Sequence, residues 1–198
     1  MANQSNFLKS LDWTVFTLRF IKNNFLIIFS LGLVAAFGRA IQLRAFGPVS
    51  PLAHTLLEIV IESARILLFF YSLGLSNLKN GLVKLIQLIT NREGRTKNWQ
   101  TALGTVQEKW LVVLINFVAF LAIAFLFNVL IDHIAYETCL FITLQSRQLI
   151  SGDSSVWALI LFFKNISVIP FTLIFEAIFF LWITNQLPGS LPPHQSVR

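Results

Sequence analysis

The sequence carries little charge. Only 12% of its 198 residues are Asp, Glu, Lys or Arg, whereas 56% are hydrophobic and the mean hydropathy is +0.72. A soluble domain has about 25% charged residues, so this chain has too few to cover a surface that faces water. The shortage indicates that a large apolar area faces lipid, an environment that suits the 20 Phe and five Trp.

Cysteine and the common catalytic motifs are also scarce. Cys139 is the only cysteine, so no internal disulfide forms and no cysteine-based zinc site is expected. The sequence has no glycine-rich phosphate loop, no GxSxG elbow and no HExxH pair. These absences argue against an enzyme, and no motif names a cofactor.

Four apolar stretches are long enough to cross about 30 Å of hydrocarbon, which takes about 20 helical residues. Residues 110–131 are hydrophobic all round, and residues 156–183 have Trp near both ends and Pro170 near the middle, where we expect a kink. Residues 52–75 and 25–43 complete the set, although both contain charges. The predicted fold is all-α, a polytopic membrane helix bundle of about four transmembrane helices with amphipathic interfacial helices.

The segments outside the spans are of several kinds. Residues 11–23 and 78–89 place apolar side chains on one helical face, which is typical of a helix on the membrane surface. A cytoplasmic extension of the preceding span explains 78–89 equally well. Residues 91–98 are predicted to be a solvated turn, and 134–150 an interfacial or bundle-covering helix rather than a fifth span. The proline-rich residues 187–198 are predicted to be an irregular tail.

Basic residues predict the orientation. With four spans and a helical domain over residues 1–186, ten Lys and Arg lie on one side of the membrane and three on the other. The ten are Lys9, Arg19, Lys22, Lys79, Lys84, Arg92, Arg95, Lys97, Lys109 and Arg198, and the three are Arg39, Arg44 and Arg147. The positive-inside rule then puts both termini in the cytoplasm, and we expect a bacterial inner membrane or an organelle membrane.

The net charge of +6 raises the question of nucleic-acid binding. The basic residues cluster beside apolar stretches, where they meet anionic lipid headgroups. We therefore expect the lipid bilayer, and not nucleic acid, to be the basic residues' partner. The predicted headgroup contacts are Lys79, Lys84, Arg92, Arg95 and Lys97.

A stripe of ionisable residues lies inside the second predicted span. His54, Glu58, Glu62 and Arg65 follow one another by four, four and three residues, so they share one helical face. Charge in hydrocarbon is costly, so this face should point into the bundle or a wet cavity. Counting residues from the hairpin puts Arg39 at nearly the same depth as Glu58, which predicts a pair between neighbouring helices.

The same count predicts a second pair and a pocket. Lys164 lies at the depth of Glu62, so these two side chains are expected to pair. Asn128, Asp132 and His133 stand at the outer end of the third span and are expected to line the mouth of the same region. Together these residues predict an outward-facing polar pocket in the outer half of the bundle.

The stripe has several interpretations. The charges neutralise one another and fix helix register, or they form a proton or ion route or a pocket for a polar or anionic ligand. Metal chelation by His54 and Glu58, or a haem or pigment between His54 and His133, fits the spacing, but no motif supports either, so we predict no metal site. Glu176 faces a partner subunit or a polar group such as Asn116.

Three functions follow from these features. The first is a non-catalytic subunit or scaffold of a membrane complex, whose helices pack against protein partners within the membrane. The second is a small transporter or channel-like protein that uses the polar pocket. The third is a membrane enzyme acting on lipid.

Overall fold

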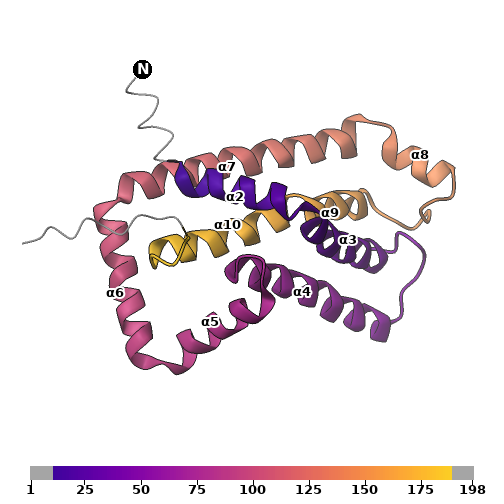
Figure 1. Cartoon of the computed structure of the whole chain (residues 1–198). Coiled ribbons are helices and arrows are strands. Elements are labelled where there is room, and N and C mark those ends of the chain that lie inside the picture. Colours follow the sequence, from indigo (N-terminus) through magenta and orange to yellow (C-terminus); the bar gives the residue numbers. More distant parts are fainter. Residues whose placement is uncertain (1–10, 189–198) are drawn as a thin grey trace, which may run out of the picture. The chain divides into compact units, whose positions relative to one another are not determined.

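The computed structural model describes residues 11–188, apart from the side chains of Asp12, Leu88 and Ile89. Within that range the chain is helical and contains no strand (Figure 1). The helices are α2 (Asp12–Asn23), α3 (Phe25–Gln42), α4 (Pro51–Leu73), α5 (Leu78–Thr90), α6 (Arg92–Glu108), α7 (Trp110–Asp132), the π-helix η1 (His133–Glu137), α8 (Leu140–Ser146), α9 (Val156–Ile166) and α10 (Val168–Ile183). Most of the predicted tail lies outside the described residues, as do Lys9 and Arg198.

Three helical segments are long and apolar enough to cross a membrane: Phe25–Gln42, Trp110–Glu137 and Val156–Ile183. They coincide with three of the four predicted spans. α4 has the length, with 23 residues, but carries three charged side chains near its middle. The chain is therefore a membrane-embedded helical protein with three candidate spans among its described residues.

The chain divides into two compact units. Unit 1 comprises residues 1–20, 70–120 and 174–198, and unit 2 comprises residues 21–69 and 121–173. α2, α4, α7 and α10 each pass from one unit into the other. Each unit has its own core.

An aromatic cluster forms the core of unit 1. Trp13 is fully buried, and its ring stacks on those of Phe179 and Trp182 with centroids 4.8 and 5.7 Å apart. Phe175 lies 4.6 Å from the same ring, and Phe117 meets it edge-on at 5.7 Å. α2 is thus held to α7 and α10 by ring contacts, each of which contributes about 0.5–1.5 kcal/mol beyond the burial of area.

One face of α2 is buried in unit 1. Trp13, Thr17 and Phe20 follow one another by four and three residues, and all three are buried. One face of the amphipathic helix predicted for residues 11–23 therefore packs on protein, while Val15 and Leu18 are exposed. The sequence does not show which apolar residues meet protein, because the helical period is the same against protein and against lipid.

A glycine pair closes the turn between α4 and α5 in unit 1. A Cβ atom on Gly81 would lie 2.0 Å from the carbonyl oxygen of Phe70, and one on Gly74 would lie 1.9 Å from that of Asn77. Any other residue at either position would push backbone against backbone. The close approach holds the start of α5 against the end of α4.

Asn91 alone separates α5 from α6. Residues 91–98, predicted to be a turn, belong to α6 from Arg92 onward, so that prediction was wrong. Asn91 ends α5 and also caps α6, since its Oδ1 accepts a hydrogen bond from the Gly94 amide at 2.9 Å. A single capping residue thus ends one helix and starts the next. The polar side chains of residues 92–98 lie on the exposed surface of α6.

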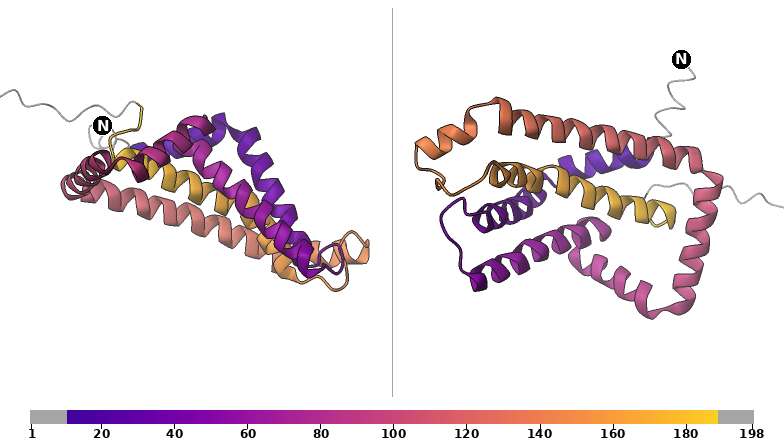
Figure 2. Two further views of the ribbon diagram at one scale, coloured as in Figure 1. Left: turned by 90° about the horizontal axis from the view of Figure 1, so that it is seen from below. Right: turned by 180° about the vertical axis from the view of Figure 1, so that it is seen from behind.

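In unit 2, α3 packs along α9, as the right-hand view in Figure 2 shows. Small residues permit this approach: a Cβ on Gly32 would lie 3.0 Å from the carbonyl oxygen of Asn165. α3 also meets α4, where a Cβ on Gly38 would lie 2.7 Å from the Ile61 side chain. The polar side chains of α3 make their contacts with α4.

The last predicted span is interrupted near Pro170. α9 ends at Ile166, and α10 begins at Val168 after Ser167, whose φ and ψ are −119° and −76°. Pro170 has no N–H, and its ring crowds the carbonyl four residues earlier, which is that of Ile166. The predicted kink is present, and it falls at Ser167 rather than at the proline itself.

Residues 134–150 do not form a spanning helix. η1 continues α7 to Glu137, and α8 has seven residues, which makes it about 10 Å long. Crossing the hydrocarbon takes about 30 Å. The preference for an interfacial or covering segment over a fifth span is consistent with this short helix.

Candidate functional site

Charged and amide side chains from α3, α4 and α9 meet in unit 2. We call this group the ionic cluster, and its members are Arg39, Gln42, Glu58, Glu62, Arg65 and Asn165. The α4 members follow one another by four and three residues and the α3 members by three, so each set shares one helical face. The close packing of α3 against α4 and α9 brings the three sets together.

Arg39 and Glu58 form the centre of the ionic cluster. The Nη1 and Nη2 atoms of Arg39 lie 3.0 and 3.3 Å from the two carboxylate oxygens of Glu58, a two-point contact. Gln42 supports both partners: its Nε2 donates to Glu58 at 2.8 Å, and its Oε1 accepts from Arg39 at 2.8 Å. The same Nε2 donates to the backbone carbonyl of His54 at 2.9 Å. The predicted Arg39–Glu58 pair is present in the structure.

The second half of the ionic cluster is arranged differently from the prediction. Glu62 pairs with Arg65 one turn away on α4, and its Oε1 lies 3.8 Å from Arg39. Arg65 then reaches α9, where its Nη2 donates to Oδ1 of Asn165 at 2.8 Å. The Nε of Arg65 is buried and has no hydrogen-bond partner among the described residues.

The charges of the ionic cluster balance. Arg39 and Arg65 contribute two positive charges, and Glu58 and Glu62 contribute two negative charges. The arginine side chains are 20% and 21% exposed, whereas those of Glu58 and Glu62 are 42% and 46% exposed. The cations are therefore buried between the helices, while the carboxylates reach the surface of unit 2.

Lys164 does not pair with Glu62. Among the described residues Lys164 makes no ion pair, and the neighbouring Asn165 makes the contact to α4. One residue of difference turns a side chain by about 100° around a helix. Counting residues gave the depth of Lys164, but it did not give the side of α9 on which it lies.

The predicted mouth residues do not converge on the ionic cluster. Asn128 donates to the Ala124 carbonyl of its own helix at 2.8 Å, and Asp132 and His133 are exposed. The His54 side chain is also exposed. Within the described part of the chain, the polar pocket reduces to the ionic cluster of α3, α4 and α9.

Gln42 and Asn165 are cluster members that sequence reasoning missed. Both are uncharged amides, and both are buried. Their positions in the sequence could have identified them, because Gln42 lies one turn from Arg39 and Asn165 adjoins Lys164 in an apolar stretch. Polar residues inside membrane helices point inward as a rule, so amides belong in the search along with charges.

Comparison with known proteins gives no match. No family model, no curated protein and no solved structure matches the chain. Within residues 11–188, no group of three His, Cys, Asp or Glu side chains is placed to hold a metal ion. The Glu58 carboxylate, which was considered with His54 for a chelate, is bound by Arg39 instead.

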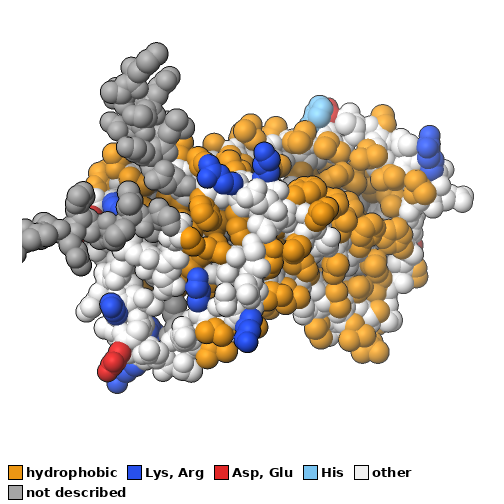
Figure 3. All heavy atoms as spheres, viewed as in Figure 1, with side chains coloured by type: hydrophobic (Ala, Val, Ile, Leu, Met, Phe, Trp, Pro, Cys, Tyr) orange, Lys and Arg blue, Asp and Glu red, His pale blue; other side chains and the backbone are white. Residues whose placement is uncertain are grey.

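The basic residues assigned to lipid headgroups fall on α5 and α6. Lys79, Arg92, Arg95 and Lys97 are exposed, and Figure 3 shows basic side chains gathered over this part of the molecule. Lys84 differs, because its Nζ donates to the carbonyl of Leu73 at the end of α4, 3.2 Å away. Burial lowers the pKa of the Lys84 ammonium. It acts as a cap for α4.

Proposed function

We propose that this chain is a multi-pass membrane protein of four spans with both termini in the cytoplasm, in a bacterial inner membrane or an organelle membrane. We propose further that it is a non-catalytic subunit or scaffold of a membrane complex. One observation carries this function: the charges of the ionic cluster are compensated within the chain. A self-compensated cluster fixes how α3, α4 and α9 pack and leaves no free charge for a solute.

α4 supplies the fourth span in this proposal. Its 23 residues extend about 34 Å, which is enough to cross the hydrocarbon. Its charges are paired with one another or with α3 and α9, which lowers the cost of placing them in lipid. The ten-to-three asymmetry of basic residues supports the orientation.

Exposed apolar helices favour partners in the membrane. Only 6% of the most apolar window of Trp110–Glu137 is buried within the chain. Much of the surface of α7 outside its contacts with Trp13 and Phe175 is thus available to lipid or to helices of other subunits. A chain with little soluble surface and a closed set of charges is suited to holding other membrane proteins together.

A small transporter or channel-like protein is the alternative. The observation that favours it is the exposure of Glu58 and Glu62, whose side chains are 42% and 46% exposed in the middle of an otherwise apolar helix. Half-exposed carboxylates in a span require water or a partner beside them. A transporter would supply water through a wet path along this face of α4, whereas a subunit would supply a partner helix.

Substitution of the two carboxylates separates these functions. Glu58→Gln and Glu62→Gln are introduced into the full chain, and the size of the native assembly is measured by native electrophoresis of gently solubilised membranes. A subunit or scaffold loses assembly, whereas a transporter keeps assembly and loses solute or proton flux in vesicles. Glu108→Gln, at an exposed position of α6, is the matched control. Unchanged assembly and unchanged flux count against both functions.

A further inference from the structure

Glu176 is an exposed acid in an apolar helix. It lies in α10, whose sequence VIPFTLIFEAIFFLWI has no other charge, within the candidate span Val156–Ile183. The side chain is exposed and has no hydrogen bond or ion pair among residues 11–188. It differs in this respect from Glu58 and Glu62, which are bound by arginines.

The depth of Glu176 makes a bare carboxylate costly. The residue stands seven positions before the end of α10 at Ile183, or about 10 Å along the helix. A charge at such a depth is unfavourable in hydrocarbon, and acids in spans almost always meet a cation or water. Glu176 therefore needs a partner that the described chain does not supply.

Two polar groups near this end of unit 1 are engaged elsewhere. Asn116, which was considered as a partner of Glu176, accepts hydrogen bonds at its Oδ1 from the Thr14 amide and hydroxyl at 3.1 and 2.7 Å. The Nζ of Lys109 lies over the ring of Trp182, 5.9 Å from its centroid. Neither group is engaged with Glu176.

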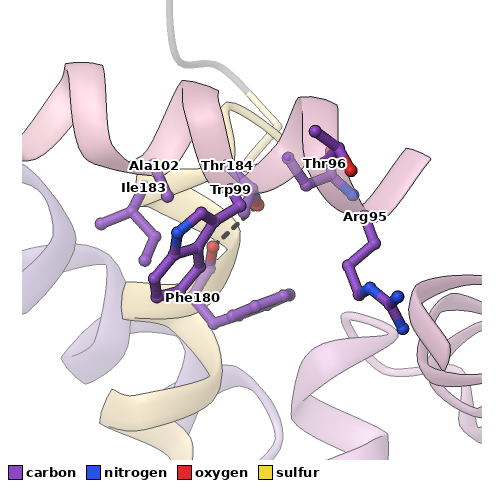
Figure 4. A pocket seen from close by; sticks show the side chains of 8 residues that line it. Arg95, Thr96, Trp99, Ala102, Phe180, Ile183 and Thr184 are labelled. Atoms are coloured by element: carbon purple, nitrogen blue, oxygen red, sulfur yellow. Dashed lines mark hydrogen bonds between the residues drawn. The ribbon is translucent and has the colours of Figure 1, made fainter. Parts of the chain in front are cut away.

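A pocket continues the face of α10 that carries Glu176. Phe180 and Ile183 follow Glu176 by four and seven residues, so they share its face. Both line a cavity of about 460 Å³ together with Trp99, Ala102 and the cation Arg95 of α6. Figure 4 shows the rings of Trp99 and Phe180 side by side in this cavity, contributed by different helices. Its volume is large enough for a bulky apolar side chain.

We propose that a transmembrane helix of a partner protein docks on this face of α10, with a Lys or Arg side chain on Glu176 and an apolar side chain in the pocket. The inference rests on the proposed subunit function and names the chemistry of the partner. The attraction between Glu176 and the partner's cation in a low-dielectric medium makes the binding specific for a basic helix. The pocket, one to two turns along α10 from Glu176, fixes the register of that helix.

Charge and depth distinguish this occupant from a lipid and from a second copy. A phosphate group is repelled by Glu176, and lipid headgroups stay at the interface. A second copy in the same orientation would have to present a free cation at the same depth. Arg39 and Arg65 are held in the ionic cluster, and Lys164 precedes Glu176 by twelve residues, or about 18 Å of helix.

Designed peptides test the proposal directly. The full chain, labelled on its single exposed cysteine Cys139, is reconstituted in phosphatidylcholine vesicles with Trp-flanked polyleucine helices of about 20 residues. One peptide carries an Arg about 10 Å from its end, and the others carry Leu or Glu at that position. Energy transfer measures association, which we expect to be about tenfold tighter for the Arg peptide than for the Leu peptide.

Variants identify the surface that binds the peptide. Glu176→Gln should reduce binding of the Arg peptide to the level of the Leu peptide, and Glu176→Lys should reverse the preference to the Glu peptide. Glu108→Gln should leave binding unchanged. Equal binding of the Arg and Leu peptides, or an Arg preference that survives Glu176→Gln, overturns the proposal. Self-association without peptide that Glu176→Gln abolishes also overturns it, because the occupant is then a second copy.

The peptide experiment can fail without the proposed subunit function failing, and the reverse. Native assembly that persists while the Arg peptide shows no preference leaves the subunit function standing and removes this docking site. A preference for the Arg peptide together with a monomeric chain in native membranes removes the subunit function instead.

Discussion

α4 and α7 have the same length, 23 residues, and yet only α7 is apolar enough to qualify as a candidate span. α7 has no charged residue before its last position, Asp132, and most of its surface is exposed. α4 carries Glu58, Glu62 and Arg65. A helix such as α7 is stable in lipid by composition alone, whereas α4 depends on what its neighbours supply.

What the neighbours supply to α4 is specific. Arg39 and Gln42 of α3 bind Glu58, and Asn165 of α9 accepts a hydrogen bond from Arg65. Without those groups Glu58 would lose its cation, and Glu62 and Arg65 would keep only each other; an unpaired charge in lipid costs several kcal/mol. α4 is therefore stable as part of the bundle, and changes around it should have larger effects than changes around α7.

The largest effect is expected at the end of α4. Gly81→Ala would place a Cβ atom 2.0 Å from the carbonyl oxygen of Phe70, so the backbones of α4 and α5 have to separate. We expect a loss of about 3 kcal/mol in unfolding free energy, at the upper end of overpacking costs. Unfolding in mixed micelles by titration with dodecyl sulfate measures it.

Gly104→Ala is the matched control for that variant. Gly104 lies within α6, and nothing is within 4 Å of its Cβ position. Alanine there should stabilise the protein by about 0.5–1 kcal/mol, because glycine is unfavourable inside a helix. Equal effects of the two substitutions would show that α4 does not depend on its contact with α5.

A smaller loss is expected from Arg39→Leu. It leaves Glu58 without its cation, and the expected cost is about 2 kcal/mol, between the values for exposed and buried pairs. Arg39→Leu combined with Glu58→Leu removes both charges of the pair. α4 then keeps only two charged residues, so the double variant should recover most of the lost unfolding free energy. The double-mutant cycle in the same micelle titration measures the coupling. Additive losses would contradict a direct pair.

The sequence predicted where the helices lie along the chain better than which helices and side chains pack against one another. Apolar length located α3, α4, α7 and the α9–α10 segment within two residues of their helix bounds, since hydrophobic thickness is a strong constraint. The hydrophobic pattern of residues 11–23 did not show that Trp13 is buried against phenylalanines. The depth count found Arg39 and Glu58 but predicted Lys164 where Asn165 makes the contact, because the depth of a residue does not show which side of its helix faces a neighbour.

The smallest effect should come from a polar contact of α7 with α2. Asn116 accepts hydrogen bonds from the amide and the hydroxyl of Thr14, and that amide is among the first of α2, which have no partner within their own helix. Asn116→Leu removes this cap, and we expect a loss of about 1 kcal/mol.

Asn128→Leu is a control for Asn116→Leu on the same helix, because the Asn128 amide donates only to its own helix, at Ala124. It should change the unfolding midpoint little. Thr14→Val, which loses the hydroxyl bond but keeps the amide bond, should show part of the loss of Asn116→Leu, and Thr14→Ser, which keeps the hydroxyl, should not. If Asn116→Leu cost as much as Arg39→Leu, α7 would depend on its neighbours as strongly as α4 does, and the contrast between the two helices would disappear. A loss of about 1 kcal/mol that is absent in Asn128→Leu would confine the dependence of α7 to this single cap.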